Sequence, residues 1–260
     1  MKKISYKIYP NQKTTCLTFS YDDGETNDIR LSALLKKYGF KGTFNLNSSN
    51  LGKPKYITEE DVKNLVKDGF EIAVHSVTHP FLETLAIEHI TAEVLEDKRA
   101  LERITGTIIT GMAYPFGTYD ERVKEVLKAC GIKYARTVKY NGFNFPADFL
   151  EWHVTCHHND LDKVSIDNLR YSNILYVWGH SYEFRTEEDW QKFENNLKRV
   201  HDNGSFWCAT NGEIYEYITA QRNLIFNADL TAVYNPSAIT VYIIVDGTVV
   251  ELPSGKTVSI

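Results

Sequence analysis

Residues 18–24 read Thr18-Phe19-Ser20-Tyr21-Asp22-Asp23-Gly24, and the interpretation of the rest of the chain starts from this stretch. The β-rich, half-apolar residues 14–19 predict a buried strand, so two adjacent carboxylates lie where that strand ends. Asp-Gly is also a strong hairpin signal, but a hairpin requires a second alternating strand directly afterwards. The sequence instead predicts a helix, capped by Asn27 and ended by Gly39. A strand that leads into a helix through polar residues is typical of the active-site end of an α/β unit.

Strand and helix patterns alternate along the next 180 or so residues. Further strands are predicted at 42–46, 70–74, 107–113, 133–137, 152–156, 174–178 and 205–209. Capping boxes at Thr58, Thr118 and Thr186 predict helix starts, and a long helical pattern runs from about 87 to 104. This alternation indicates parallel βαβ units, and seven or eight of them favour an α/β fold of the (β/α)7–8 barrel type over residues 1–222.

The last residues have a different pattern. Short β runs at 230–233, 239–245, 248–251 and 257–260 follow one another, and Asp246-Gly247 predicts a hairpin turn between two of them. Because such a strand set is marginally stable alone, we expect residues 223–260 to form a small antiparallel β appendage packed on the barrel.

Composition limits the classes of function. The 260 residues are 43% hydrophobic and carry a net charge of -5, which argues against disorder, a nucleic-acid-binding surface or an anionic-membrane surface. No segment approaches the roughly 18 apolar residues of a membrane helix. The cysteines are far apart and predict free thiols rather than a disulfide framework or a zinc knuckle: Cys16, Cys130, Cys156 and Cys208. Since no apolar signal segment follows the basic N-terminus, we expect a cytoplasmic protein, with a signal trimmed from the chain as the alternative.

Potential metal ligands and acid–base groups follow three of the predicted strands. Asp22 and Asp23 follow the first strand, His75 and His79 the third, and His180 the seventh, and the corresponding strand ends of a barrel converge on one face. The four-residue spacing of the first two histidines would place both imidazoles on one side of a helical turn, although two unrelated loop histidines are the alternative. Two histidines and one carboxylate would leave coordination positions open, as a catalytic metal site requires.

At these residues the sequence resembles the polysaccharide deacetylases (NodB-homology, carbohydrate esterase family 4). Phe19-Ser20-Tyr21-Asp22-Asp23-Gly24 matches the first family motif, T-F-D-D-G, with a Ser-Tyr pair interrupting the Phe-Asp step. The stretch from His75 to His79 matches the second motif, H-[ST]-x-x-H, and Trp178-Gly179-His180 matches the late L-x-H motif with Trp in place of Leu. The resemblance covers roughly residues 14–210. It implies a distorted (β/α) barrel of the NodB type, a divalent metal, and hydrolysis of an N-acetyl or O-acetyl group on a sugar.

The resemblance also implies roles for single residues. Asp23, His75 and His79 would bind the metal, with Zn²⁺ expected first and Co²⁺, Ni²⁺ or Mn²⁺ as alternatives. Asp22 would be the general base and His180 the general acid.

An oxyanion would be stabilised by the metal and, by the same resemblance, by the backbone N–H of Phe116 in the Tyr-Pro-Phe-Gly turn. The family's third motif, R-x-P-[YF]-G, departs here because Ala113 occupies the arginine position. Arg136, at the end of the next predicted strand, could place a guanidinium in the same space, and we take this as a hypothesis. A surface or structural ion-pair role for Arg136 is the alternative.

Several aromatic side chains are candidates for stacking against a sugar, although core packing explains such residues equally well: Tyr114, Trp152, Trp178 and Tyr182. Asp148 or Glu151 could be the acid that supports His180.

Three histidines in residues 151–158 have open roles. His153 is expected in packing or behind the site, and His157 and His158 either line the mouth of the site or lie on the surface.

Together these residues predict a metal-dependent deacetylase of N-acetylated glycans or oligosaccharides, which uses an Asp base and a His acid. One alternative keeps the barrel but hydrolyses another non-peptide C–N bond or an ester, because fold does not fix substrate. The other alternative is a catalytically silent glycan-binding barrel. The expected partner is a carbohydrate, without nucleic acid.

Overall fold

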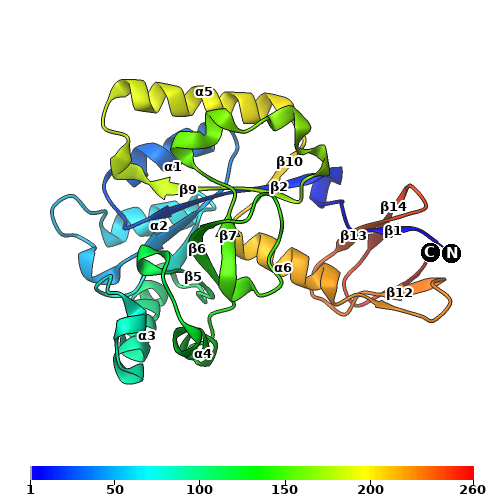
Figure 1. Cartoon of the computed structure of the whole chain (residues 1–260), viewed down its shortest axis with the longest axis horizontal. Coiled ribbons are helices and arrows are strands. Elements are labelled where there is room, and N and C mark those ends of the chain that lie inside the picture. The colour runs from blue at the N-terminus through cyan, green and yellow to red at the C-terminus, as the bar shows by residue number, and fades with distance from the viewer. Residues whose placement is uncertain (1) are drawn as a thin grey trace.

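The structure is a computed structural model that describes residues 2–260. Its centre is a nine-stranded parallel sheet with the order β7-β6-β5-β4-β3-β2-β9-β8, and β10 pairs with β2 (Figure 1). The strands are β2 (Thr15–Asp22), β3 (Thr43–Leu46), β4 (Glu71–Val74), β5 (Gly111–Ala113), β6 (Tyr134–Tyr140), β7 (Trp152–Val154), β8 (Cys156–His157), β9 (Ile174–His180) and β10 (Phe206–Cys208). Strands β7 and β8 stand at the two ends of this order but are separated by one residue, Thr155. Residues 152–157 therefore bring the two ends together in a nearly closed barrel, as predicted.

Helices follow most of the strands. They are α1 (Asn27–Lys37), α2 (Glu59–Lys67), α3 (Ile87–Thr105), α4 (Glu121–Ala129), α5 (Glu187–Asn203) and α6 (Asn211–Arg222). Short 3₁₀ helices are η1 (Pro10–Gln12), η2 (Ser48–Asn50), η3 (Leu82–Thr84), η4 (Pro115–Gly117), η5 (Phe149–Glu151), η6 (His158–Lys163), η7 (Ile166–Tyr171) and η8 (Ser181–Glu183). In Figure 1, α1 and α5 lie on one side of the central strands and α3 and α4 on the opposite side. Within residues 2–260, no helix is both long and apolar enough to cross a membrane.

The helix starts follow the predicted capping signals with exceptions. The capping boxes at Thr58 and Thr186 are present. The box expected at Thr118 is wrong, because Asp120 directly precedes α4 and its side chain accepts the Val123 N–H instead.

Two further starts differ from the prediction. Asn27 is the first residue of α1 rather than its cap, and its amide donates to the Ser181 carbonyl. Helix α6 was not predicted at all, although a capping box at Thr210 begins it.

The side chains of strand β2 alternate between the hydrophobic core and the polar interior of the barrel. All eight of its residues are buried, and Leu17, Phe19 and Tyr21 pack into the main hydrophobic core. Successive side chains of a strand point to opposite faces, so Ser20 and Asp22 point to the other face. There the barrel interior is polar, and Asn45 Nδ2 donates to Ser20 Oγ and Asp22 Oδ1, both at 2.9 Å.

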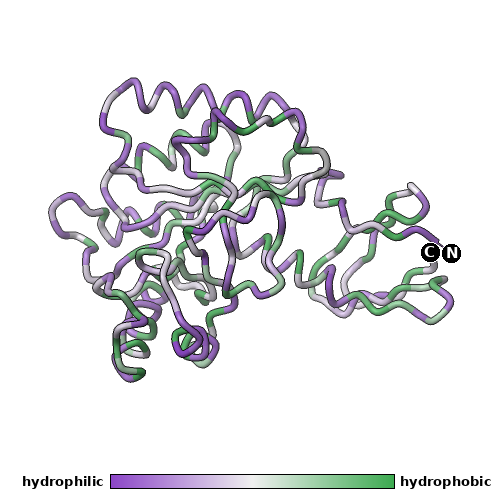
Figure 2. Tube along the Cα trace, in the orientation of Figure 1, coloured by the Kyte–Doolittle hydropathy of each residue, from purple (hydrophilic) through white to green (hydrophobic). Residues whose placement is uncertain are grey.

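Two small antiparallel sheets form the appendage. They have the orders β1-β13-β14 and β11-β12-β15. The strands are β1 (Ile4–Ser5), β11 (Ile225–Phe226), β12 (Ala232–Tyr234), β13 (Val241–Val245), β14 (Thr248–Leu252) and β15 (Thr257–Ser259). The predicted hairpin at Asp246-Gly247 joins β13 to β14, and both turn residues have the positive φ that such a turn requires (49° and 87°). Figure 2 shows hydrophobic strands in this appendage and hydrophilic outer turns on the barrel helices.

The N-terminus is part of the appendage, because β1 pairs with β13. The Lys2 ammonium donates to the Ile260 carbonyl, so the two ends of the described chain lie close together (Figure 1). Helix α6 links both parts, since Gln221 Nε2 lies 3.1 Å from the carbonyl oxygens of Ile8 and Tyr242. The prediction assigned residues 1–222 to the barrel and therefore did not place β1 in the appendage. The domain boundary after residue 222 stays a prediction.

Candidate active site

The carboxyl ends of the barrel strands bring the predicted site residues together. In the register of β2 and β9, Asp22 lies beside His180, and β4 ends one residue before His75. His79 reaches the same place through the loop after β4. This convergence follows from parallel strand order, which places the carboxyl ends of all strands at one face.

Asp23, His75 and His79 form a cluster that suits a divalent cation. Asp23 Oδ1 lies 3.6 Å from His75 Nε2 and 3.7 Å from His79 Nε2, and the three ligand atoms lie within 4.8 Å of one another. The His75 side chain is buried, whereas Asp23 and His79 are 21% and 27% exposed, so one side of the cluster is open. Two imidazoles and a carboxylate are a common ligand set for a catalytic zinc site with an open position. The donor set therefore fits the metal that the sequence predicted, without identifying the element.

Contacts behind the cluster fix the His75 imidazole. Its Nδ1–H donates to the Ala113 carbonyl at 2.8 Å, which leaves the Nε2 lone pair directed at Asp23. A backbone carbonyl at this position is a frequent support for a metal-binding histidine. The His75 backbone N–H donates to buried Asp97 at 3.1 Å, so both the chain and the ring are held.

The two histidines are not on a helical turn, so that part of the prediction is wrong. Ser76 and His79 both have left-handed backbones, with φ of 66° and 58°, and the turn between them brings the ring centroids to 4.7 Å. Asn47 Nδ2 donates to the carbonyls of His75 and Ser76, at 2.6 Å and 2.9 Å, and supports the turn. Asp23 also has a positive φ, of 77°. Non-glycine residues in this region each cost about 1–3 kcal/mol, and such strain is concentrated at functional sites.

Arg136 faces Asp22 inside the barrel. The Arg136 guanidinium donates to Asp22 Oδ2, and the two side chains are 0% and 3% exposed. Burial raises the pKa of Asp22, but the charges of Arg136, His75 and His180 outweigh it and hold the pKa below its usual value. The Asp22 carboxylate is therefore ionised and oriented by the arginine and by Asn45.

The position of Arg136 explains how the guanidinium reaches Asp22 although residue 113 is alanine. Strands β5 and β6 are parallel neighbours, and Ala113 is the register partner of Arg136. The guanidinium thus comes from the adjacent strand at the same level of the barrel. It also lies over the Trp178 ring, with Cζ 4.9 Å from the ring centroid, which favours a buried cation.

His180 completes the group of acid–base side chains. Its Nε2 lies 3.8 Å from Asp22 Oδ2 and 3.9 Å from Asp23 Oδ2. On the other side, Nδ1 lies 3.6 Å from Glu183 Oε2, and the same oxygen accepts the His180 backbone N–H at 3.0 Å. Burial lowers the pKa of His180, but Glu183, Asp22 and Asp23 together raise it above its usual value.

The acid beside His180 was not predicted. Asp148 and Glu151 were the candidates, but both bind Lys124 instead, with Asp148 Oδ2 2.9 Å from its Nζ. Glu183 is three residues after His180 in a short 3₁₀ helix, a spacing that brings side chains near one another. That spacing was the available signal in the sequence.

Only some of the predicted aromatics are accessible. Trp152 and Tyr114 are wrong as substrate-binding residues, because they are 0% and 1% exposed. Trp152 packs into the core against Tyr134, and the Tyr114 hydroxyl donates to the Leu150 carbonyl at 2.9 Å. Trp178 is half-buried beneath Arg136.

The rim of the site is formed by other aromatic side chains. Phe116 is 48% exposed, lies edge-on to His79 and stacks on exposed Phe81, with centroids 3.8 Å apart. Tyr182 is also exposed and stacks on His180, with centroids 4.9 Å apart. Phe81 was missed in the sequence because no motif includes it.

The histidines after β7 also have defined places. His153 Nδ1 lies 2.7 Å from Thr137 Oγ1, and Thr137 points to the face of β6 opposite Arg136, so a role of His153 behind the site stays a prediction. His157 and His158 both approach Glu183, and His158 is buried rather than on the surface.

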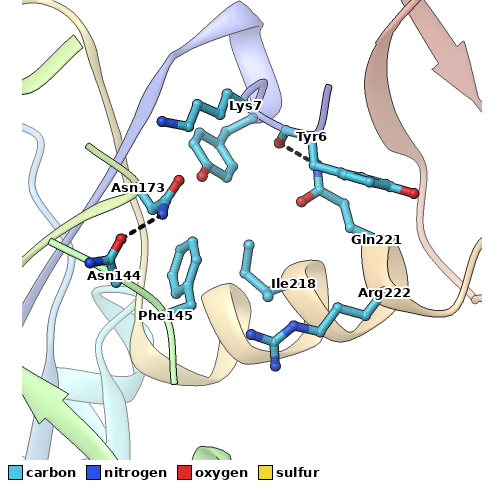
Figure 3. A pocket seen from close by; sticks show the side chains of 9 residues that line it. Tyr6, Lys7, Asn144, Phe145, Asn173, Ile218, Gln221 and Arg222 are labelled. Carbon is cyan, nitrogen blue, oxygen red and sulfur yellow. Dashed lines mark hydrogen bonds between the residues drawn. The ribbon is translucent and has the colours of Figure 1, made fainter. Parts of the chain in front are cut away.

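A separate cavity of about 300 Å³ lies beside helix α6 and the segment that follows β1 (Figure 3). Asn173 on its wall directly precedes β9, so the cavity is at the opposite end of the barrel strands from His180. It is lined by Tyr6, Lys7, Tyr9, Asn144, Phe145, Asn173, Ile218, Gln221 and Arg222. We assign it no part in the candidate active site.

Sequence comparison supports the motif analysis. A family model described as polysaccharide deacetylase matches residues 7–135. The Bacillus subtilis protein YxkH is 31% identical over 121 residues, which cover 46% of this chain and 42% of that protein. The B. subtilis peptidoglycan-N-acetylmuramic acid deacetylase PdaC is 32% identical over 125 residues, which cover 46% of this chain and 25% of that protein. The matched region therefore spans less than half of either relative.

Structural comparison supports the fold. A Mycobacterium smegmatis protein superposes with a TM-score of 0.64 at 16% identity, covering 82% of this chain and 93% of that one. A carbohydrate esterase family 4 pseudoenzyme from Bacillus anthracis has a TM-score of 0.56 at 19% identity, covering 80% and 66%. At these identities the likeness establishes the barrel and leaves the activity open.

Proposed function

This chain belongs to the polysaccharide deacetylase family, and from that premise we propose that it is a metal-dependent hydrolase that removes acetyl groups from an N-acetylated or O-acetylated glycan or oligosaccharide. The observation that carries the proposal is the Asp23–His75–His79 cluster beside the ionised Asp22 and the His180 imidazole. Ligands, base and acid are thus within one open site.

Asp23, His75 and His79 would hold the divalent cation. When bound, such a cation supplies Lewis acidity toward a water molecule and toward the acyl oxygen of the substrate. Asp22 is not needed as a ligand in this arrangement, so its carboxylate stays available as a base.

Asp22 would accept the proton of the attacking water. A general base must be ionised and held in place, and both requirements are met by its contacts with Arg136 and with Asn45 Nδ2 at 2.9 Å. Arg136 in turn would keep the carboxylate ionised in a buried position, where an unpaired charge is costly.

His180 would donate a proton to the departing amine or alcohol of the sugar. Its Nε2 faces the carboxylates of the site, whereas its Nδ1 faces Glu183, 3.6 Å away. An imidazole with a carboxylate on its far side is stabilised in the protonated form, and the pKa of His180 is raised, which is the direction that a general acid requires.

The exposed aromatic rim suits a sugar substrate. The rim lies beside the Asp23–His75–His79 cluster and His180 and consists of Phe116, Phe81 and Tyr182. Aromatic faces provide apolar contact area with fixed geometry. PdaC is named for action on N-acetylmuramic acid in peptidoglycan. We therefore propose an N-acetylated amino sugar as the substrate unit, with zinc as the first metal to test.

The test is acetate release from N-acetyl-chito-oligosaccharides and from peptidoglycan fragments, with and without a chelator. Asp22→Asn should keep the bound metal and lower the rate about 10³-fold, because general-base catalysis contributes about 10²–10⁴-fold. Asp229→Asn, an exposed substitution in the appendage, is the matched control and should not change the rate. Chelator-insensitive release, or full activity of Asp22→Asn, would contradict the proposal.

A catalytically silent glycan-binding barrel is the second candidate, and Ala113 at the family's arginine position favours it. It predicts oligosaccharide binding without acetate release under any metal. Release only from small amides or esters that are not sugars would instead favour a hydrolase of another substrate class.

A further inference from the structure

A second group of metal-ligating side chains lies next to His180, on the side away from Asp22. We call His157, His158 and Glu183 the Glu183 cluster. Glu183 Oε2 lies 2.9 Å from His157 Nε2 and 3.6 Å from His158 Nε2, and the three ligand atoms lie within 4.8 Å of one another. We propose that the Glu183 cluster binds a second divalent transition-metal ion, separate from the one expected at Asp23, His75 and His79.

His158 is the observation that points to a ligand. Its side chain is 1% exposed, and neither of its ring nitrogens has a hydrogen-bond partner among the described residues. A buried polar group without a partner costs about 1–3 kcal/mol, so its position requires an explanation. In a neutral imidazole one ring nitrogen carries a free lone pair. A cation at Nε2 would satisfy this nitrogen.

The surroundings hold the His158 ring in place. It stacks on Phe184 and Tyr21, with centroids 4.4 Å and 5.7 Å apart. Gly179 leaves room for it, since a Cβ at that position would lie 2.1 Å from His158 Nδ1. The backbone and side chains therefore fix the ring with its Nε2 toward Glu183, before any ion binds.

The other two ligands come from separate elements and are partly accessible. His157 is the last residue of β8 and is 15% exposed, and Glu183 is 26% exposed in η8. His157 Nδ1 accepts the Asn159 N–H at 3.3 Å, so its Nε2–H donates to Glu183 when no ion is present. An ion would take the place of this proton, as metal binding to histidine does in general. Two imidazoles and one carboxylate favour Zn²⁺, Co²⁺ or Ni²⁺ over Mg²⁺ or Ca²⁺.

Occupation of the Glu183 cluster has a consequence that rests on the proposed function. Glu183 Oε2 is also the carboxylate oxygen nearest to His180 Nδ1, at 3.6 Å. An ion that binds this oxygen removes it from His180, the proposed acid. Excess zinc should therefore slow acetate release by the wild type, and His157→Ala should abolish this inhibition relative to its own basal rate.

Metal stoichiometry tests the site without reference to activity. The metal-free protein is titrated with Zn²⁺ in a calorimeter, and the zinc content is measured after gel filtration. The wild type should bind two ions per chain, and the double variant Asp23→Asn/His79→Ala should bind one. His157→Ala and Glu183→Gln should each also bind one, and combining His157→Ala with the double variant should leave none.

His201→Ala is the matched control, because it removes an exposed histidine on α5 and should leave two ions bound. Circular dichroism checks that each variant is folded, and the use of two cluster variants protects the test against one misfolded protein. A wild type that binds one ion, or two ions that persist in both His157→Ala and Glu183→Gln, would overturn the proposal. A wild type that binds two ions but releases no acetate would instead count against the proposed function and not against the second metal site.

Discussion

Arg136→Met removes the guanidinium that faces Asp22 and keeps most of the side-chain volume. Both partners are buried, at 0% and 3% exposure, so solvent does not screen the pair. Removing one partner of a buried ion pair costs about 3–5 kcal/mol. Asn45 still donates to Asp22 at 2.9 Å, so we expect the free energy of unfolding to fall by about 3 kcal/mol, the lower end of this range. If the pair also orients the base, kcat/KM should fall by about 10²-fold, the lower end of what general-base catalysis contributes.

The same free energy predicts a change in pH dependence. Arg136 stabilises the ionised form of Asp22, so its removal raises the pKa of that carboxyl. A loss of about 3 kcal/mol equals about two pH units, because one unit is 1.36 kcal/mol. The acidic limb of kcat/KM should therefore move up by about two pH units. Zinc content should not change, since Arg136 forms no hydrogen bond or ion pair with Asp23, His75 or His79 among the described residues.

The assay is acetate release between pH 4 and 9, with zinc measured on the same samples. Arg99→Met, which removes an exposed arginine on α3, controls for the loss of one positive charge. Ala113→Arg/Arg136→Ala moves the guanidinium back to the register partner on β5 and should recover part of the lost rate. A folded Arg136→Met that keeps its zinc, its wild-type rate and its acidic limb would refute the role given to Arg136.

Two further predictions concern stability. Burial raises the pKa of Asp97 to about 7, despite the hydrogen bonds from Ser48 and His75 that lower it. A carboxyl whose pKa is raised in the folded state stabilises the fold fully below its unfolded pKa, about 3.9. That contribution to stability is lost as pH rises through about 7. The free energy of unfolding should therefore fall by up to about 1.4 kcal/mol per pH unit between pH 4 and 7, and urea denaturation of Asp97→Asn should show a flatter profile; parallel profiles would contradict this assignment. Gly179→Ala places a Cβ 2.1 Å from His158 Nδ1 and should lower the unfolding free energy by about 1–3 kcal/mol in the same assay, whereas an unchanged midpoint would show that the ring can move away.

The strand ends and their order were predictable because they depend on local patterns. The alternation of strands and helices places Asp22, Asp23, His75 and His180 at one face of any parallel barrel. Arg136 was also within reach of the sequence, since the next strand predicted after Ala113, residues 133–137, ends beside it. The register of β5 and β6 then places the two residues side by side.

Other features depend on the three-dimensional path of the chain. The left-handed turn at Ser76 and His79 is held by Asn47, 28 residues away from the His75 carbonyl in the sequence, and no local signal encodes it. Trp152 is an aromatic residue of the kind that can stack on a sugar, but its side chain is buried in the core. Strand β1 joins the appendage through pairing with β13, a contact between opposite ends of the chain.

The most direct test is a crystal structure of the zinc-loaded protein with anomalous scattering measured at the zinc edge. The account predicts an anomalous peak about 2.0–2.2 Å from a carboxylate oxygen of Asp23 and from Nε2 of His75 and His79, with Asp22 outside the coordination sphere. A protein that binds zinc but shows no peak at these three side chains would contradict it.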